Sequence, residues 1–212
     1  MGSTESLVVP DVLIVIDVQN DFCHADGALA HRGADISGMP QVAANNERLA
    51  AAYRAAAKPV IYMRTEHGPW TNSVNWSSRM RHLSPEAKEA TPICAAGTWG
   101  EDFYDVHPQP EDRVITKHRY SAFFMTPLEV VLRAHQATSL LLTGVVTNVC
   151  VETTARDAFM RDYRTLVVRE ACAAPSPEEH RAALHNIDTY FGQVVGIEDV
   201  LEAMPDRQAK VS

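Results

Sequence analysis

The sequence contains few cysteines and no long apolar run. Only 4 of its 212 residues are cysteine, and they lie far apart without a C-x-x-C pair, which argues against a disulfide framework and against a zinc site. No apolar run approaches the ~20 residues that cross a bilayer, and the opening MGSTESLVVPD lacks the basic flank of a secretory signal. We therefore expect a cytoplasmic protein with reduced thiols and no membrane contact.

Positive charge is scarce as well. The chain has 19 Lys and Arg against 27 Asp and Glu, for a formal net charge of -8. Because a protein that coats nucleic-acid phosphates needs a basic face, we expect no nucleic-acid partner. The 46% of hydrophobic residues suffices for a sizeable core, and no linker or repeat interrupts the chain. We expect residues 1–212 to form a single domain, with residues 1–10 as a flexible N-terminal extension.

What the sequence does contain is a regular alternation of strand-like and helix-like segments. Short apolar runs, typical of strands buried on both faces, occur at residues 12–16, 60–63, 113–116, 140–142, 165–168 and 194–195. Amphipathic or Ala-rich segments predict helices at residues 39–57, 126–135, 147–162, 177–190 and 197–204. This order predicts an α/β protein with a three-layer, Rossmann-like fold, in which a six-stranded parallel sheet carries helices on both faces.

Three reactive side chains lie near the predicted carboxyl ends of these strands, where ligands bind in such sheets. Asp17 follows the first strand, Lys117 follows the third, and Cys150 lies in the first turn of the helix after the fourth. The helix dipole and a nearby ammonium both favour a thiolate, and a neighbouring carboxylate is able to carry the thiol proton to a leaving nitrogen. The three together favour a nucleophilic cysteine enzyme.

Each of these residues also has an ordinary structural interpretation. An Asp after a strand often serves a turn, a Lys is by default a solvated charge, and a Cys between two valines is by default a small buried hydrophobe. Spacing alone does not decide between these interpretations and catalysis.

The segment 67–110 is long and irregular, with Trp70, Trp76 and Trp99, and loops of that length often cover a site.

Three segments resemble the motifs of the isochorismatase-like cysteine hydrolases. Residues 13–22 (LIVIDVQNDF) resemble the opening motif of that family, residues 117–123 (KHRYSAF) its lysine segment, and residues 142–152 (LTGVVTNVCVE) its nucleophile motif. The order and separation of the segments also fit, and the resemblance spans about residues 12–196.

The resemblance implies an Asp17–Lys117–Cys150 triad on a six-stranded parallel sheet. In that triad Cys150 is the nucleophile, Asp17 carries the proton, and Lys117 holds the thiolate. The resemblance also implies a cis peptide bond between Val145 and Val146, with the backbone amides of Val146 and Cys150 forming an oxyanion hole. It further implies a homodimer or homotetramer and a reaction that needs no metal and no organic cofactor.

The branch of the family determines the expected substrate. True isochorismatases lack the nucleophilic cysteine, so Cys150 argues against that branch. Nicotinamidases carry an Asp-x-His metal motif after the second strand, where this chain has Glu66 and His67 side by side, so we expect no such metal site. Residues 97–100, 108–110 and 117–128 look most like the ureidoacrylate amidohydrolase branch, whose relatives cleave compounds such as biuret and triuret.

We therefore expect cleavage of the C–N bond of a small ureido or carbamoyl compound through a thioester intermediate. Phe22 and Tyr120 are the expected pocket walls, and Thr65, Glu66 and Arg119 are the expected polar contacts to substrate. Two alternatives remain open: a nicotinamidase-like or other small-amide hydrolase, and a non-catalytic binding or assembly module. Thr65 stands where an Asn is expected in ureidoacrylate hydrolases, which leaves the exact substrate open.

Overall fold

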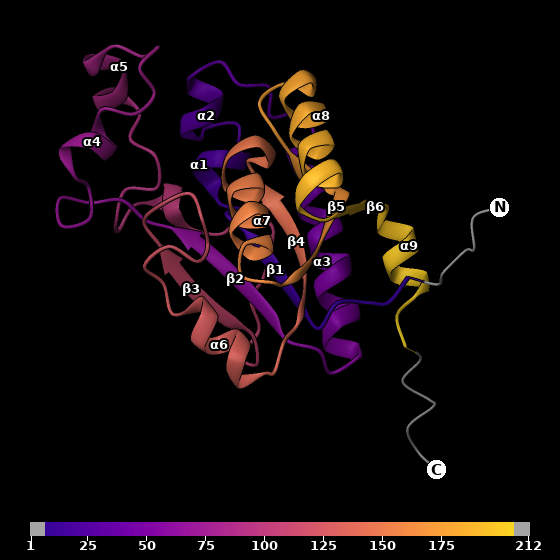
Figure 1. The fold of residues 1–212 in the computed structure, drawn as a ribbon. Helices are drawn as coiled ribbons and strands as arrows, with labels where there is room; N and C mark the ends of the chain where they lie inside the picture. Colours follow the sequence, from indigo (N-terminus) through magenta and orange to yellow (C-terminus); the bar gives the residue numbers. More distant parts are fainter. Residues whose placement is uncertain (1–6, 206–212) are drawn as a thin grey trace.

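Six parallel strands form the centre of the structure, in the order β3-β2-β1-β4-β5-β6 (Figure 1). The computed structural model describes residues 7–205. The strands are β1 (Val12–Ile16), β2 (Val60–Thr65), β3 (Arg113–Lys117), β4 (Ser139–Val145), β5 (Arg164–Ala173) and β6 (Gln193–Val195). Every neighbouring pair is parallel, so the predicted α/β class with a six-stranded parallel sheet is confirmed.

Helices cover both faces of this sheet and one of its ends. In the described part of the chain the α-helices are α1 (Asn20–Cys23), α2 (Ala28–His31), α3 (Met39–Ala55), α4 (Val74–Ser77), α5 (Pro85–Ala90), α6 (Leu128–Ala134), α7 (Glu152–Phe159), α8 (Pro177–Asn186) and α9 (Ile197–Glu202). Shorter turns are the 3-10 helix η1 (Trp99–Glu101) and the π-helical segments η2 (Thr147–Val151) and η3 (Ile187–Phe191). Figure 1 shows α1, α2, α4 and α5 grouped beyond the carboxyl ends of the strands.

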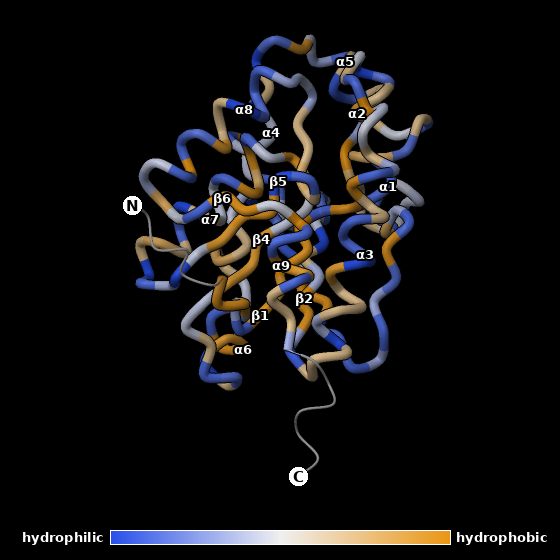
Figure 2. Tube along the Cα trace, turned by 90° about the vertical axis from the view of Figure 1, so that its right-hand side faces the viewer, coloured by the Kyte–Doolittle hydropathy of each residue, from blue (hydrophilic) through white to orange (hydrophobic). Residues whose placement is uncertain are grey.

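Alternate residues of the central strand face two separate cores. Leu13 and Val15 of β1 pack with residues of α3 and α9 on one face, whereas Ile14 and Ile16 pack with α6, α7 and α8 on the other. Because both faces are buried, the strand is apolar at every position. Figure 2 shows this as orange, hydrophobic strands inside a shell of bluer helices and loops.

Several helix ends differ from the expected ones for local reasons. The helix expected from residue 126 begins at Leu128, because the Thr126 hydroxyl accepts a hydrogen bond from the Leu128 amide (3.2 Å). The single helix expected over residues 147–162 is divided, so Cys150 lies in the π-helical segment η2 and not in an α-helical first turn. Lys117 is the last residue of β3 and does not follow it.

The N-terminal extension expected at residues 1–10 lies partly outside the described residues, which begin at Leu7. Leu7 and Val9 pack against the core on the α3 face. No helix within residues 7–205 has the length and apolar composition of a membrane span.

Candidate active site

The predicted reactive residues meet where the connections from the sheet diverge, between β1 and β4. The chain leaves β1 toward β2 and leaves β4 toward β5, which makes this edge the switch point at which α/β sheets bind ligands. Asp17 follows β1 with a φ of 54°, which is uncommon for a residue other than glycine. Cys150 lies in η2, directly after β4, and Lys117 reaches the same point from the end of β3, two strands away.

Gly144 allows β4 to approach the end of β1 closely. Its φ is 107°, and a Cβ atom at this position would lie 2.0 Å from the carbonyl oxygen of Ile16. No other residue type fits both requirements. The next peptide bond, Val145–Val146, is cis, and η2 then begins at Thr147. The glycine in the nucleophile motif therefore places the nucleophile segment beside Asp17.

The Lys117 ammonium is the centre of the site. Its Nζ lies 2.7 Å from Asp17 Oδ2 and 3.4 Å from Cys150 Sγ. It also donates to the Thr65 hydroxyl (2.8 Å) and to the Arg119 carbonyl (3.0 Å). Carboxylate, ammonium and sulfur thus lie within bonding reach, although more than 30 residues separate each from the next.

Thr65 bridges the acid and the amine. Its Oγ1 donates to Asp17 Oδ1 at 2.9 Å and accepts from Lys117 at 2.8 Å. The side chain of Gln19 fixes the backbone of Thr65 on both sides, with Oε1 accepting from the Thr65 amide and Nε2 donating to its carbonyl, each at 2.8 Å. We expected Thr65 to be a polar contact for substrate, but in the structure both hydrogen bonds of its hydroxyl go to catalytic candidates.

Burial determines the protonation of the Cys150 thiol. Asp17, Lys117 and Cys150 are all buried. Burial raises the pKa of the Cys150 thiol to about 12, Lys117 opposes this rise, and Asp17 adds to it. This direction is opposite to the one expected from the lysine and the helix end alone. Burial also acts against the charge of Lys117, but Asp17 and Cys150 raise the pKa of its ammonium, so the lysine stays charged.

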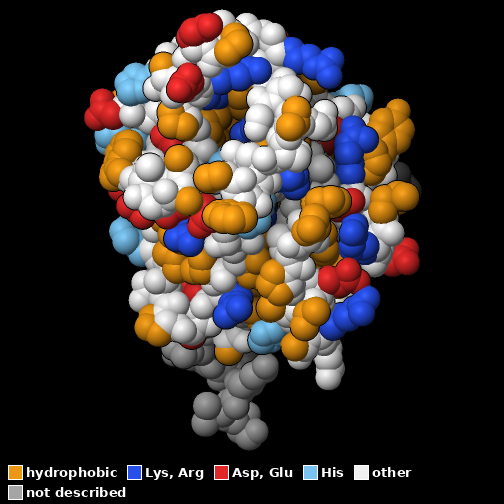
Figure 3. All heavy atoms as spheres, turned by 90° about the vertical axis from the view of Figure 1, so that its left-hand side faces the viewer, with side chains coloured by type: hydrophobic (Ala, Val, Ile, Leu, Met, Phe, Trp, Pro, Cys, Tyr) orange, Lys and Arg blue, Asp and Glu red, His pale blue; other side chains and the backbone are white. Residues whose placement is uncertain are grey.

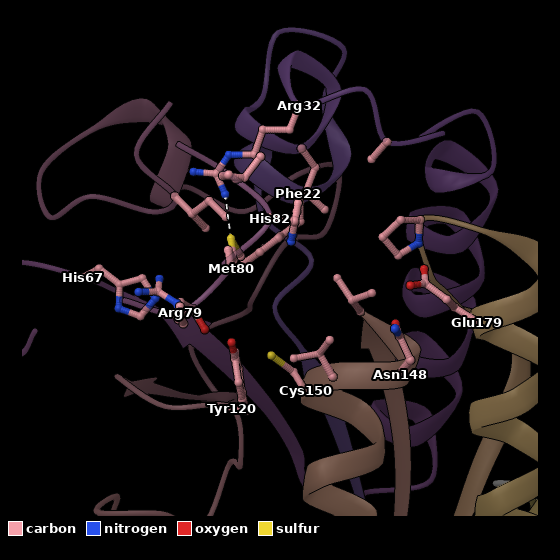
Figure 4. Close-up of a pocket in the computed structure, with 18 of the residues that line it drawn as sticks. Phe22, Arg32, His67, Arg79, Met80, His82, Tyr120, Asn148, Cys150 and Glu179 are labelled. Carbon is pink, nitrogen blue, oxygen red and sulfur yellow. Dashed lines mark hydrogen bonds between the residues drawn. The ribbon is translucent and has the colours of Figure 1, made fainter. Parts of the chain in front are cut away.

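A cavity of about 570 Å³ opens above these groups (Figure 4). Lys117, Val146 and Cys150 lie on its wall, and Figure 4 shows the Cys150 sulfur and the Tyr120 hydroxyl pointing into it. Among the expected contacts, Phe22, Thr65, Arg119 and Tyr120 line the cavity. Glu66 does not: its amide donates to the Lys117 carbonyl and its carbonyl contacts the His118 ring, so its prediction as a substrate contact is not supported.

The remaining wall comes largely from the segment that was expected to cover the site. Trp76, Arg79, Met80, His82, Leu83 and Ile93 all line the cavity, and Leu29 and Arg32 join them from the α2 region. Sequence reasoning did not identify these individual residues, because the segment 67–110 has no periodicity that would indicate which side chains point inward. Trp70 is exposed to solvent, and only Trp76 of the three tryptophans lines the cavity.

The polar residues of the opening motif hold this covering segment in place. The Gln19 Nε2 atom also donates to the Glu101 carbonyl at 2.7 Å, and Asn20 donates to the Trp99 carbonyl at 2.9 Å. The Asp21 carboxylate accepts from the Cys94 amide at 2.6 Å. These contacts tie the loop over residues 94–101 to the end of β1.

Cations surround the histidine that follows β2. Burial, together with the nearby charges of Arg79, Lys117 and Arg119, lowers the pKa of His67 to about 3, so the ring is neutral near pH 7. Within residues 7–205, no group of three or more His, Cys, Asp or Glu side chains is arranged to hold a metal ion.

The chain matches the model of the isochorismatase domain over residues 11–199. It is 41% identical over 192 residues to a curated protein of Methylobacterium radiotolerans named ureidoacrylate amidohydrolase RutB, an alignment that covers 86% of this chain and 74% of the relative. The structure is similar to a cysteine hydrolase from Pseudomonas syringae (28% identity, TM-score 0.78, 94% and 98% coverage). It is also similar to the nicotinamidase PncA of Bacillus subtilis (27% identity, TM-score 0.70, 87% and 98% coverage).

Proposed function

We propose a specific reaction for this chain, which belongs to the isochorismatase family and is a hydrolase of non-peptide C–N bonds. It cleaves a small ureido or carbamoyl compound, and Cys150 is the nucleophile. The observation that carries this proposal is the Lys117 ammonium, 2.7 Å from Asp17 and 3.4 Å from the Cys150 sulfur on the cavity wall. The relative named ureidoacrylate amidohydrolase supports a ureidoacrylate-type substrate.

The reaction starts with a protonated thiol, because burial raises the pKa of Cys150. Asp17 takes the thiol proton as the sulfur attacks the substrate carbonyl and forms the S–C bond. The C–N bond then breaks, and Asp17 returns the proton to the departing nitrogen, which leaves as ammonia or an amine. Water, deprotonated by Asp17, attacks the thioester intermediate, the S–C bond breaks, and Asp17 reprotonates the sulfur.

The oxyanion of the tetrahedral intermediate needs donors beside the sulfur. We assign this part to the backbone amides of Val146 and Cys150. Val146 lines the cavity, and within the described residues its amide donates no backbone or side-chain hydrogen bond, while its carbonyl accepts from Val149 (3.0 Å) and Val151 (3.3 Å). The amide is therefore free to bind a developing negative charge.

Turnover of a small panel tests this function. Ammonia release is measured with ureidoacrylate, biuret, triuret, N-carbamoyl amino acids and nicotinamide as substrates. We expect one of the ureido or carbamoyl compounds to be the best substrate, and we expect Cys150→Ala to abolish its turnover without unfolding the chain. The matched control is Cys172→Ala, since Cys172 is also buried but does not line the cavity. Full activity in Cys150→Ala would contradict the mechanism.

A nicotinamidase-like activity is the alternative that the similarity to PncA supports. Chelator-sensitive release of nicotinic acid from nicotinamide would favour it over the ureide proposal. The cations around His67 oppose this alternative, because they disfavour a divalent metal ion at the place where nicotinamidases carry their metal motif. A non-catalytic binding module predicts no turnover of any compound in the panel.

We also propose a homodimer or homotetramer, as the family resemblance implies. Exposed apolar side chains such as Met125 and Met160 offer surface for contacts between copies. Light scattering on the purified chain gives the mass of the assembly and checks this proposal.

A further inference from the structure

The cavity carries more positive charge than the catalytic lysine supplies. Arg32, Arg79 and Arg119 all line it, and none of the three forms an ion pair with an acid of residues 7–205. The acid on the wall is Glu179, whose side chain is exposed to solvent. In a chain with a net charge of -8, this cavity is a local cationic site.

Two of these arginines donate hydrogen bonds to other residues of the protein. Arg32 donates through Nε to the Thr91 hydroxyl at 2.8 Å and through Nη2 to the Thr91 carbonyl. Arg119 donates to the carbonyls of His118 (2.6 Å) and Thr71 (3.1 Å). Both guanidinium groups therefore fasten the covering segment, and their positions are explained without a ligand.

Arg79 is different, because its Nε–H has no hydrogen-bond partner within residues 7–205 although the guanidinium also contacts the Tyr120 hydroxyl. Its Nη1 donates to the Trp76 carbonyl at 2.8 Å, and its guanidinium carbon lies 4.4 Å from the centre of the Trp76 ring. The Nε–H of Arg79 and the indole N–H of Trp76 are both buried and have no partner within residues 7–205. The Arg79 side chain as a whole is half-buried, and an unpaired buried donor such as its Nε–H is costly. In Figure 4 Arg79 lies on the same side of the cavity as the Tyr120 hydroxyl, above Cys150.

A second hollow lies next to this part of the cavity. It has a volume of about 920 Å³ and shares Arg32, His67 and Arg79 with the inner cavity. Its other charged residues are Arg81, Lys88 and a single acid, Glu89. Figure 3 shows blue Lys and Arg side chains around the hollowed upper part of this face. A hollow in which one sign of charge predominates attracts ligands of the opposite sign.

We propose that Arg79 binds a carboxylate of the substrate, with the Trp76 indole N–H as a second donor, and therefore that the substrate is a ureido or carbamoyl acid and not a neutral ureide. The guanidinium offers Nε–H and Nη2–H side by side, the fork that fits a carboxylate with two parallel hydrogen bonds. The bound anion supplies the missing partners and the missing counter-charge. This inference rests on the proposed function for the identity of the reacting group.

The first experiment measures the charge preference without any turnover. Iodoacetate and iodoacetamide alkylate a thiolate by the same step, in which the S–C bond forms and iodide leaves, and they differ in carrying a carboxylate or a neutral amide. The rate of alkylation of Cys150 by each reagent is followed by mass spectrometry at one pH. Their ratio cancels the thiolate fraction, so a change in the pKa of Cys150 does not affect it.

We expect Arg79→Gln to lower the ratio of the iodoacetate rate to the iodoacetamide rate by roughly 10-fold or more. The reason is that a carboxylate without its charged partner loses most of its binding free energy. Arg113→Gln is the control, because it removes one positive charge at an exposed position that does not line either hollow. Arg79→Lys keeps the charge without the fork and should give an intermediate ratio, also if Arg79→Gln is too unstable to purify. An unchanged ratio in Arg79→Gln and Arg79→Lys would overturn the proposal.

The second experiment separates this inference from the proposed function. We compare kcat/KM for N-carbamoyl-β-alanine and for its uncharged primary amide. We expect Arg79→Gln to lower kcat/KM by roughly 100-fold for the acid and by less than about threefold for the amide. Equal losses of kcat/KM for both substrates would show that Arg79 is a structural residue. That result would contradict this inference and leave the proposed function intact. If the panel of ureides is not turned over at all but the alkylation ratio falls, the proposed function fails and the anion site remains.

Discussion

The floor and the roof of the cavity are built on different principles. The floor, formed by Asp17, Thr65, Lys117 and Cys150 at the strand ends, is fully buried, and its charges are paired within 3 Å. The roof, residues 76–93, includes α5, a helix without any buried residue, and it carries an arginine without a counter-charge. In the function that we propose, the sheet therefore positions the catalytic groups, and the roof selects the substrate.

The difference follows from what each part packs against. The strands of the floor are buried on both faces, so their ends are held by two cores. The roof is tied by polar contacts such as the two hydrogen bonds of Arg32 with Thr91, and next to it the Cys94 amide donates to Asp21. Segments with few buried apolar contacts open at low free-energy cost. Binding residues on such loops also change more readily in evolution than the scaffold beneath them.

Removing the lysine should break the floor most severely. Lys117→Met leaves the Asp17 carboxylate buried without a counter-charge, so we expect unfolding to become easier by about 3–5 kcal/mol and turnover to fall on the order of 10³-fold. Urea denaturation and steady-state kinetics measure the two effects. Lys88→Met on α5 of the roof should cost less than about 0.5 kcal/mol. Equal stability losses in the two variants would contradict the contrast between floor and roof.

The pH dependence of alkylation tests the burial of the nucleophile. Burial raises the pKa of Cys150 to about 12, so the thiol is protonated at pH 7 and the thiolate fraction grows as the pH rises. We expect the rate of alkylation by iodoacetamide to increase about tenfold per pH unit between pH 7 and pH 9. Mass spectrometry assigns the label to Cys150. A rate that is already constant above pH 7 would show a thiolate at rest instead.

A change at Thr65 sharpens the distinction between positioning and binding. Thr65→Val removes one hydrogen-bond partner each from Asp17 and Lys117, which costs about 1–3 kcal/mol for buried groups. We expect kcat to fall by roughly 10-fold with KM little changed, and Thr65→Ser to restore most of it. A variant that raised KM alone would return Thr65 to the substrate contact that we first expected.

The smallest expected effect is a loosening of the roof. Arg32→Lys keeps the positive charge but loses the fork that binds Thr91. We expect hydrogen exchange of residues 77–92 to become faster by about threefold to tenfold, with exchange in β1 and β4 unchanged. If β1 and β4 exchanged faster as well, the two parts would form one cooperative unit and the contrast would fail.

Prediction from sequence succeeded where local pattern carries the information. Residues Val12–Ile16 are predicted as a buried strand because every position is apolar. Apolar runs of this kind were sufficient to place Asp17, Lys117 and Cys150 near strand ends. The partners of Thr65 lie on β3 (Lys117) and directly after β1 (Asp17), so its role required the register of the sheet. Arg79 lies in a segment without periodicity, and nothing in the sequence indicates that its Nε–H is buried without a partner within residues 7–205. The direction of the pKa of Cys150 likewise depends on burial, which spacing does not give.

A nucleophile that rests as a protonated, enclosed thiol has a consequence for the lifetime of the protein. Peroxide attacks the thiolate form of cysteine, and the sulfinic and sulfonic products of further oxidation inactivate such a residue permanently. The raised pKa of Cys150 leaves little thiolate near pH 7, and in the proposed mechanism Asp17 accepts the thiol proton only when a substrate occupies the cavity. If Cys150 is the nucleophile that we propose, its sulfur therefore rests between catalytic cycles in the form that peroxide attacks least.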